Sequence, residues 1–478
     1  MVAVTSAAPT VRAAPPLLRD WSAWAIAGTW LGLWWFGHPL PHVDDLFFTG
    51  TGIEWAKTGR FENPWLGAWM ETFGTRLYLV HPPFFPYFVA AWVTLFGSTT
   101  AALTGFHCLA SCSTSMALYS GLRRHGVAAS SAVAAVVPLV LLLLSMGMRP
   151  DSVALLPVIL AQHCFARHGT WGWILGSALS AAAVLTQSFT VALVVPLFLW
   201  QAIRVTRAGG NVRVLAGATA LGLGITFVLF CWVLPTTIAE FLRVYLLHAR
   251  LVTTSFQESA AMVWAALSFG REPLRMGPGW LCIGAALVFA LRRRSPAAGL
   301  RGAWGVLGGV AVLGSVLYAT YAVRYVHYAG LILAIATFAA SASARPVGMA
   351  LVILAAAWSN AGMIAGWLRT PPPGDSRPWG DAVAGHAGRR LLVDAVAARV
   401  VFDFQLPEGA TDWSSRQPAG RGYGSSIRDK PSDEIWLVSA CRLEHHVPDA
   451  GIRAARLRFL GHTFNSVDGD PARVHLIP

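Results

Sequence analysis

The sequence predicts an α-helical polytopic membrane protein with a small α/β domain at its C-terminal end. Hydrophobic residues make up 55% of the chain and charged residues only 12%, whereas soluble globular proteins carry about 25% charged residues. Apolar runs long enough to enter a bilayer recur almost to residue 367, and the composition beyond them is polar and charged. These two observations define a membrane region, 21–367, and a soluble domain, 368–478.

The apolar run 21–40 is longer than the core of a signal peptide and lacks a small-residue cleavage site near its end. We therefore interpret it as the first of about eleven transmembrane helices. The others are expected at 101–122, 127–146, 152–166, 171–187, 189–203, 214–234, 279–291, 303–322, 325–341 and 347–367. The run Phe84–Phe96 is short and Pro-punctuated, so we expect a helix that lies in or on the membrane without crossing it.

Arginines indicate the orientation, because Lys and Arg are enriched in cytoplasmic loops. This threading places one group of arginines on a single side: Arg12, Arg19, Arg123, Arg124, Arg167, Arg204, Arg207, Arg213, Arg292, Arg293, Arg294, Arg301 and Arg345. The tail 1–20 is therefore expected in the cytoplasm. The first loop, within 41–100, the turn 148–151, the loop 235–278 and the segment after 367 are expected outside. The formal net charge of +13 is explained by this placement, so we expect no nucleic-acid partner.

The segment 368–478 has the composition of a separate small domain. It follows the linker signal Pro371-Pro372-Pro373-Gly374 and contains β-like runs at 390–393, 435–439 and 455–459. Its length of about 110 residues suffices for one small α/β domain. Five of the six cysteines fall in expected spans, so no disulfide framework is implied.

The first outer loop carries an adjacent acid pair, Asp44 and Asp45, shortly after the first span. Two adjacent carboxylates cannot both ionise freely unless a cation lies beside them. The pair is therefore a candidate general base or metal site. The alternative interpretation is the start of an interfacial helix, with Asp at the cap and in the first turn.

Cationic side chains also gather on the expected outer face. Arg76 and His81 lie in the first loop, and Arg149 lies in the turn 148–151 with Asp151. Arg324 and His327 begin the span near 325. Charged groups at this depth cost a few kcal/mol unless they are paired or hydrated. Together they suggest a site for an anionic, membrane-embedded molecule such as a lipid phosphate, which Arg binds with a planar fork. The alternatives are a local Arg149–Asp151 ion pair that shapes a turn and a headgroup-anchoring Arg324.

Short motifs along 1–367 resemble the polyprenyl-phosphate-dependent glycosyltransferases of the GT-C fold. They are most similar to glycosyltransferase family 39 and its relatives, the protein O-mannosyltransferases and lipid A aminoarabinose transferases. The matching residues are Asp44-Asp45, Gly59-Arg60-Phe61, His81-Pro82-Pro83, Leu95-Phe96-Gly97, Arg149-Pro150-Asp151 and Arg324-Tyr325. Asp45 stands where many relatives have Glu, and His81 where Lys is common. Neutral His is a weaker anion partner than Lys.

The resemblance implies a GT-C-like catalytic module in a bacterial inner membrane, with its active site facing the exterior. A polyprenyl-phosphate-linked sugar would enter from the bilayer, and the hydroxyl of a cell-envelope glycan, lipid or protein would displace the lipid phosphate with inversion. Asp44 would be the general base, Asp45 would position the acceptor or a cation, and Asp151 would be a second acceptor-side acid. The candidate donor phosphate ligands are Arg76, His81, Arg149, Arg324 and His327.

The resemblance leaves metal dependence open, because some relatives use a divalent cation and others do not. Asp44, Asp45 and His81 would be its candidate ligands. The chief alternative function is a transporter or flippase of lipid-linked glycans, and a non-catalytic scaffold is a third. A transporter would not explain the large polar loop after the first span or the soluble domain on the same face, so both features favour the transferase. Transporters also often show two-fold internal repeats, and none is evident in this sequence.

Overall fold

The computed structural model describes residues 20–39, 44–124, 127–145, 147–166, 169–252, 388–393, 395–407, 410–412, 432–439 and 474–477. The spans expected at 279–291, 303–322, 325–341 and 347–367 lie outside the described residues, as does the β-like run 455–459. Most of the described chain is helical.

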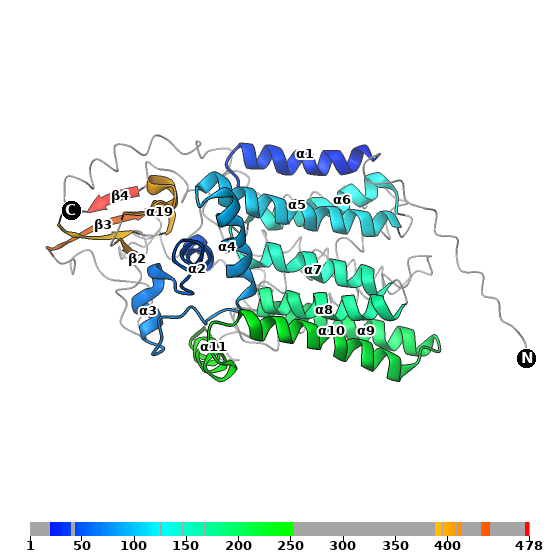
Figure 1. Cartoon of the computed structure of the whole chain (residues 1–478). Coiled ribbons are helices and arrows are strands. Elements are labelled where there is room, and N and C mark those ends of the chain that lie inside the picture. Colours follow the sequence, from blue (N-terminus) through cyan, green and yellow to red (C-terminus); the bar gives the residue numbers. More distant parts are fainter. Residues whose placement is uncertain are drawn as a thin grey trace, which may run out of the picture.

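A bundle of roughly aligned helices forms the larger part of the described chain (Figure 1). Its members are α1 (Trp21–Trp35), α5 (Thr100–Arg124), α6 (Ala129–Ser145), α7 (Pro150–Phe165), α8 (Thr170–Thr186), α9 (Val191–Arg207) and α10 (Val212–Val233). Each span expected before residue 235 corresponds to one of these helices, with ends shifted by a few residues. From α5 to α10 successive helices reverse direction, so the connections alternate between the two ends of the bundle.

Among the described helices, α10 alone is both long and apolar enough to cross a membrane by length and composition; α4 and α8 are apolar but shorter. Most bundle helices have 15 to 17 residues, or at most about 25 Å, against a hydrocarbon core of about 30 Å. Helix α5 is longer, but it turns Thr104, His107 and Ser111 inward. By this measure the described helices do not support the expected count of about eleven spans.

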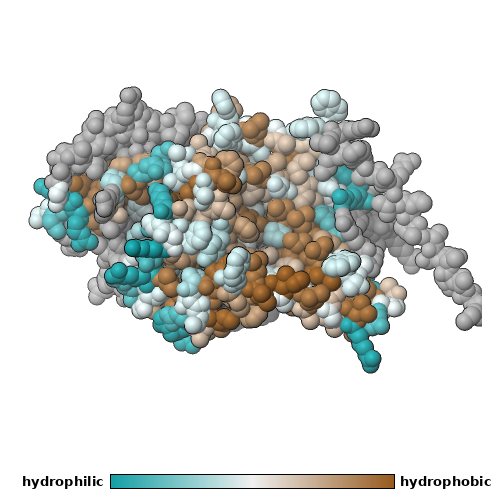
Figure 2. All heavy atoms as spheres, viewed as in Figure 1, coloured by the Kyte–Doolittle hydropathy of each residue, from teal (hydrophilic) through white to brown (hydrophobic). Residues whose placement is uncertain are grey.

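Apolar side chains cover much of the outside of the bundle. On α9 the exposed residues Val191, Val195, Leu199 and Ile203 recur every fourth position, which aligns them along one helix face. Helix α10 exposes an even longer series: Val212, Val214, Leu221, Leu223, Ile225, Phe227, Val228, Leu229 and Trp232. Figure 2 shows this apolar surface over the middle of the bundle, with hydrophilic atoms nearer its ends.

Shorter helices lie across one end of the bundle (Figure 1). They are α2 (Asp45–Thr58), the 3-10 turn η2 (Pro64–Leu66), α3 (Gly67–Glu71), α4 (Phe84–Phe96) and α11 (Ile238–Val252). Helix α4 has the bounds and the crosswise placement expected of a helix that does not span. It packs closely on α2, where a Cβ on Gly52 would lie 2.6 Å from the backbone oxygen of Pro86.

Helix α11 corrects the expectation of a loop at 235–278, at least as far as residue 252. Phe241, Val244 and His248 are buried, and they recur at the three- and four-residue spacing of one helix face. The same face meets the aromatic cluster around Trp69 and Phe73. The spacing was present in the sequence, so the helix could have been predicted from its periodicity.

The C-terminal segment contributes β1 (Arg390–Val393), α19 (Ala395–Phe402), β2 (Thr411–Asp412), β3 (Glu434–Ser439) and β4 (Val474–Ile477). The sheet order is β2-β1-β3-β4, with β1 parallel to β2 and β3, and β4 antiparallel to β3. The strands expected at 390–393 and 435–439 are confirmed. The described elements therefore form a small α/β unit.

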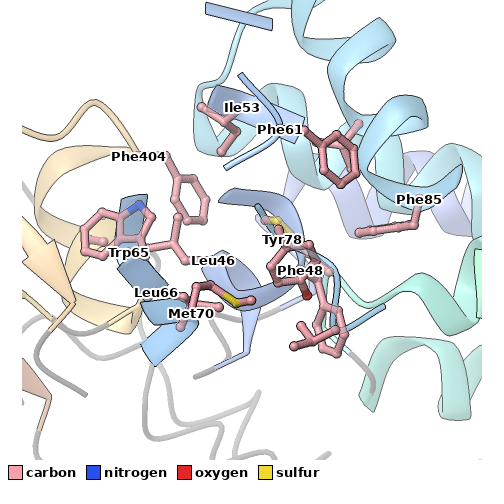
Figure 3. Packing of buried hydrophobic residues seen from close by; sticks show 14 of the residues in the cluster. Leu46, Phe48, Ile53, Phe61, Trp65, Leu66, Met70, Tyr78, Phe85 and Phe404 are labelled. Atoms are coloured by element: carbon pink, nitrogen blue, oxygen red, sulfur yellow. The ribbon is translucent and has the colours of Figure 1, made fainter. Parts of the chain in front are cut away.

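The α/β unit shares a hydrophobic core with the short helices. Figure 3 shows Phe404, which follows α19, beside Trp65 of η2 and Leu46 of α2. All three side chains are at most 6% exposed. The same cluster includes Leu391 of β1, so the end of the bundle and the α/β unit are packed as one body.

Helix contact inside the bundle gives a direct test of the packing. A Cβ on Gly222 would lie 2.3 Å from the backbone oxygen of Ile174, whereas a Cβ on Gly224 would meet nothing within 4 Å. We expect Gly222→Ala to separate α8 from α10 and to destabilise the protein by about 1–3 kcal/mol. Gly224→Ala, on the open face of α10, is the matched control. Thermal unfolding in detergent should rank the variants in this order, and equal melting temperatures would contradict the packing.

Candidate functional site

The acid pair lies where α2 begins. Asp44 occupies the N-cap position and Asp45 the first turn, but the Asp44 side chain makes no capping bond. Its carboxylate instead pairs with the guanidinium of Arg149, and 32% of the side chain remains exposed. The helix-start interpretation and the site interpretation of the pair therefore describe the same position. Asp44 is oriented by a cation and still reachable from outside.

Arg149 is almost completely buried, with 4% of its side chain exposed. It occupies the N-cap position of α7 without a side-chain capping bond, and its Nε donates to Asp151 Oδ2 at 3.1 Å. The guanidinium carbon lies 4.7 Å from the ring centroid of Phe48, a favourable cation–π arrangement. Asp151 also accepts a hydrogen bond from Gln187 Nε2 at 3.3 Å. The expected local Arg149–Asp151 ion pair is present, and it belongs to a larger cluster.

Asp45 points the other way and is 0% exposed. Its Oδ2 accepts from Arg399 Nη1 at 2.9 Å, and its Oδ1 accepts from the backbone N–H of Met148 at 3.0 Å. Arg399 comes from α19 in the α/β unit and has 2% of its side chain exposed. Asp45 therefore faces the protein interior, where an acceptor molecule has no access, and the expected role of positioning an acceptor does not fit this arrangement.

Three carboxylates and two guanidinium groups meet at this end of the bundle. One negative charge is therefore in excess when all five groups are ionised. Asp45 and Asp151 are nearly inaccessible, whereas Asp44 is the carboxylate with substantial exposure. Buried charges are expensive unless they are paired. Here Arg149 pairs with Asp151 and Arg399 pairs with Asp45, so both buried carboxylates are compensated. The group able to exchange a proton with a ligand is Asp44.

His81 lies beside this cluster among aromatic rings. Its ring centroid is 5.1 Å from that of Phe48 and 5.6 Å from that of His248. Burial, with smaller contributions from His248 and Arg149, holds the pKa of His81 well below its ordinary value. His81 is therefore neutral at physiological pH. A neutral imidazole provides no charge for a phosphate, so this placement weakens the expected phosphate-binding role.

The candidate metal ligands are not brought together. In the part of the chain that the structure describes, no group of three or more His, Cys, Asp or Glu could hold a metal ion. Asp44 and Asp45 face two different arginines, and His81 lies among rings. In this arrangement these residues do not fit a divalent cation.

The remaining sequence candidates lie elsewhere. Arg76 is 76% exposed and pairs with Glu71 at 3.5 Å, outside the buried cluster. Arg324 and His327 fall outside the described residues. Sequence reasoning missed Gln187 and Arg399. Gln187 is the polar last residue of the span expected at 171–187, which is a usable signal, but nothing near Arg399 in the sequence connects it with residue 45.

Comparison with protein-family models, curated proteins and solved structures finds no match to this chain.

Removing the central cation tests the cluster. Among the described residues, Arg149→Met would leave buried Asp151 with the Gln187 amide as its side-chain partner, and breaking a buried ion pair from one side costs about 3–5 kcal/mol. Arg76→Met removes one partner of an exposed pair and should cost less than about 1 kcal/mol. Thermal or chemical unfolding of the two variants measures the difference. A loss for Arg149→Met as small as that for Arg76→Met would contradict the buried cluster.

The buried histidines predict a pH dependence of stability. Burial lowers the pKa of His248 to about 4, whereas an unfolded chain has about 6.5. Between these values the unfolded state binds more protons, so stability should fall as pH decreases from about 6.5 to about 4. His248→Phe should make this decrease shallower, with His81 among the other shifted groups that supply the remainder, and Leu247→Phe on the exposed side of α11 is the control. Unfolding across this pH range measures it; an unchanged slope in His248→Phe would contradict the assignment.

Proposed function

We propose that this chain is a membrane glycosyltransferase of the GT-C type. It would transfer a sugar from a polyprenyl-phosphate donor to an acceptor hydroxyl on the outer face of a bacterial inner membrane. The observation that carries the proposal is the partly exposed Asp44 carboxylate beside the buried Arg149 guanidinium, at one end of a helical bundle with an apolar exterior. A base for a hydroxyl and a cation for a phosphate are the two groups that this reaction requires.

In the proposed reaction Asp44 accepts the proton of the acceptor hydroxyl. The acceptor oxygen bonds to the anomeric carbon, and the bond from that carbon to the phosphate oxygen breaks with its electron pair on the phosphate. Arg149 stabilises the departing anion with its planar fork. Because Arg149 now contacts Asp44, donor phosphate would replace Asp44 on the guanidinium and release the carboxylate to act as base.

Asp151 takes a different role from the acceptor-side acid expected at first. Its side chain is only 7% exposed and holds the Arg149 Nε. We therefore assign it to orienting Arg149 for the phosphate. Gln187 donates to the other oxygen of Asp151, so Asp151 can keep the Arg149 guanidinium in place when Asp44 leaves it.

The distribution of charge supports the orientation. Alternating helix directions bring Arg123, Arg124, Arg204, Arg207 and Arg213 to the bundle end away from the cluster. Positive residues favour the cytoplasmic side, which leaves Asp44 outside. Apolar patches on soluble monomers rarely exceed a few hundred Å², and the exposed faces of α9 and α10 are better matched to lipid. We retain the arrangement of about eleven spans as part of this proposal.

The decisive test is glycosyl transfer in membranes supplied with a mixture of radiolabelled polyprenyl-phosphate sugars. Asp44→Asn keeps the shape of the side chain but not the base, so transfer should fall by at least about 100-fold. Glu54→Gln is the matched control, because Glu54 lies on the same helix and its side chain accepts only from Thr58 in the described structure. This control should transfer at the wild-type rate.

Each variant is first checked for normal expression and membrane insertion. Transfer by Asp44→Asn at the wild-type rate would remove Asp44 as base. Movement of labelled lipid across the bilayer by the wild type, without transfer to any acceptor, would instead establish the flippase alternative.

A further inference from the structure

We propose that Arg399 of the α/β unit is a positioning residue for the membrane-embedded site, acting through Asp45 and the backbone of Met148 on Arg149. This inference rests on the proposed transferase function. It assigns the C-terminal unit a specific task, which is to hold the turn that presents the phosphate-binding arginine.

The connection begins with a fully buried ion pair. Arg399 Nη1 donates to Asp45 Oδ2 at 2.9 Å, while Nη2 donates to the backbone oxygen of Pro39 after α1. One guanidinium therefore ties the α/β unit both to the end of α1 and to the start of α2. Burial lowers the pKa of Arg399 and the Asp45 carboxylate opposes that shift, as expected for a cation stabilised by its partner.

The second step runs from Asp45 to the site. Its other oxygen, Oδ1, accepts the backbone N–H of Met148 at 3.0 Å. The next residue is Arg149, whose guanidinium meets Asp44 and Asp151. Asp45 thus uses one oxygen for the α/β unit and the other for the turn before α7, so a change in its orientation would remove one of the bonds that hold this turn.

The α/β unit is itself anchored beside this ion pair. Asp403 Oδ1 accepts the backbone N–H of Thr100 at the start of α5 at 2.6 Å, and Gln405 donates to Ser98 Oγ at 2.8 Å. Phe404, between them, is buried in the shared hydrophobic core. These contacts locate α19 independently of Arg399, so the unit should stay docked when that one side chain is changed.

Without Arg399, the buried carboxylate of Asp45 would lose the guanidinium that lies 2.9 Å from its Oδ2 and would have to reorient or take up a proton. Either change weakens its bond to Met148. The expected consequence is a displaced Arg149, and misplacement of a catalytic group by about 1 Å can reduce the rate by about 100-fold. Because Arg149 is assigned to the phosphate that departs in the reaction, a displaced guanidinium should lower kcat more than it raises KM.

The test compares full-length Arg399→Met with the double variant Asp45→Asn plus Arg399→Met. An Asn side chain at 45 still offers an oxygen to Met148 but carries no buried charge. We expect Arg399→Met to lower kcat by at least about tenfold and to speed hydrogen exchange of the peptide containing 147–149. The double variant should recover part of the lost kcat and part of the lost protection from hydrogen exchange at 147–149. Arg389→Gln, at an exposed position preceding β1, is the control and should match wild type.

Two outcomes would overturn the proposal. One is wild-type exchange and kcat in Arg399→Met. The other is a double variant whose melting temperature recovers while its exchange and kcat do not, which would make the pair structural only. If the wild type transfers no sugar, the transferase proposal fails by itself, and exchange at 147–149 still decides whether Arg399 controls this turn.

Discussion

The buried ion pair between Asp45 and Arg399 is the constraint on which the arrangement of the site depends. It joins residues 354 positions apart and unites the end of α1, the start of α2 and the α/β unit. Isolated buried charges are expensive, and a pair is tolerated only when its other hydrogen-bonding groups are also satisfied. Here Met148 and Pro39 supply two of those bonds, whereas Arg399 Nε has no hydrogen-bond partner among the described residues. The pair therefore holds the backbone at Met148 and at Pro39.

Two helices begin at this point, and both place an acid in the first turn: Asp45 in α2 and Asp151 in α7. The partial positive charge of each helix N-terminus stabilises these carboxylates. The same effect disfavours a cation there, which explains why Arg149, at the N-cap of α7, is accompanied by Asp44 and Asp151. The positive ends of two helices and two arginines thus compensate the carboxylates of the cluster, and the accessible carboxylate, Asp44, lies at its edge.

Aromatic packing encloses the cluster on the side of the short helices. Phe48 covers the Arg149 guanidinium, and Tyr78 and His81 continue the wall toward α11. Burial, with the nearby Asp44 charge, raises the pKa of Tyr78 well above its ordinary value, so Tyr78 stays protonated. A wall of neutral groups excludes water and strengthens the charge interactions beside it, as the proposed role of Arg149 beside a departing lipid phosphate requires.

The sequence by itself determined the helical class, the positions of α1 and α5 to α10, the crosswise helix α4 and two strands of the α/β unit. These features follow from local apolar periodicity and run length, which a single segment records. It also singled out Asp44, Arg149 and Asp151, because charges near a membrane surface are costly and therefore conspicuous. Only the tertiary structure decided that Asp44 and Asp45 face opposite partners, that His81 belongs to an aromatic wall, and that Arg399 reaches Asp45. Each of these depends on segments far apart in the chain being packed against one another, and no local pattern encodes that packing.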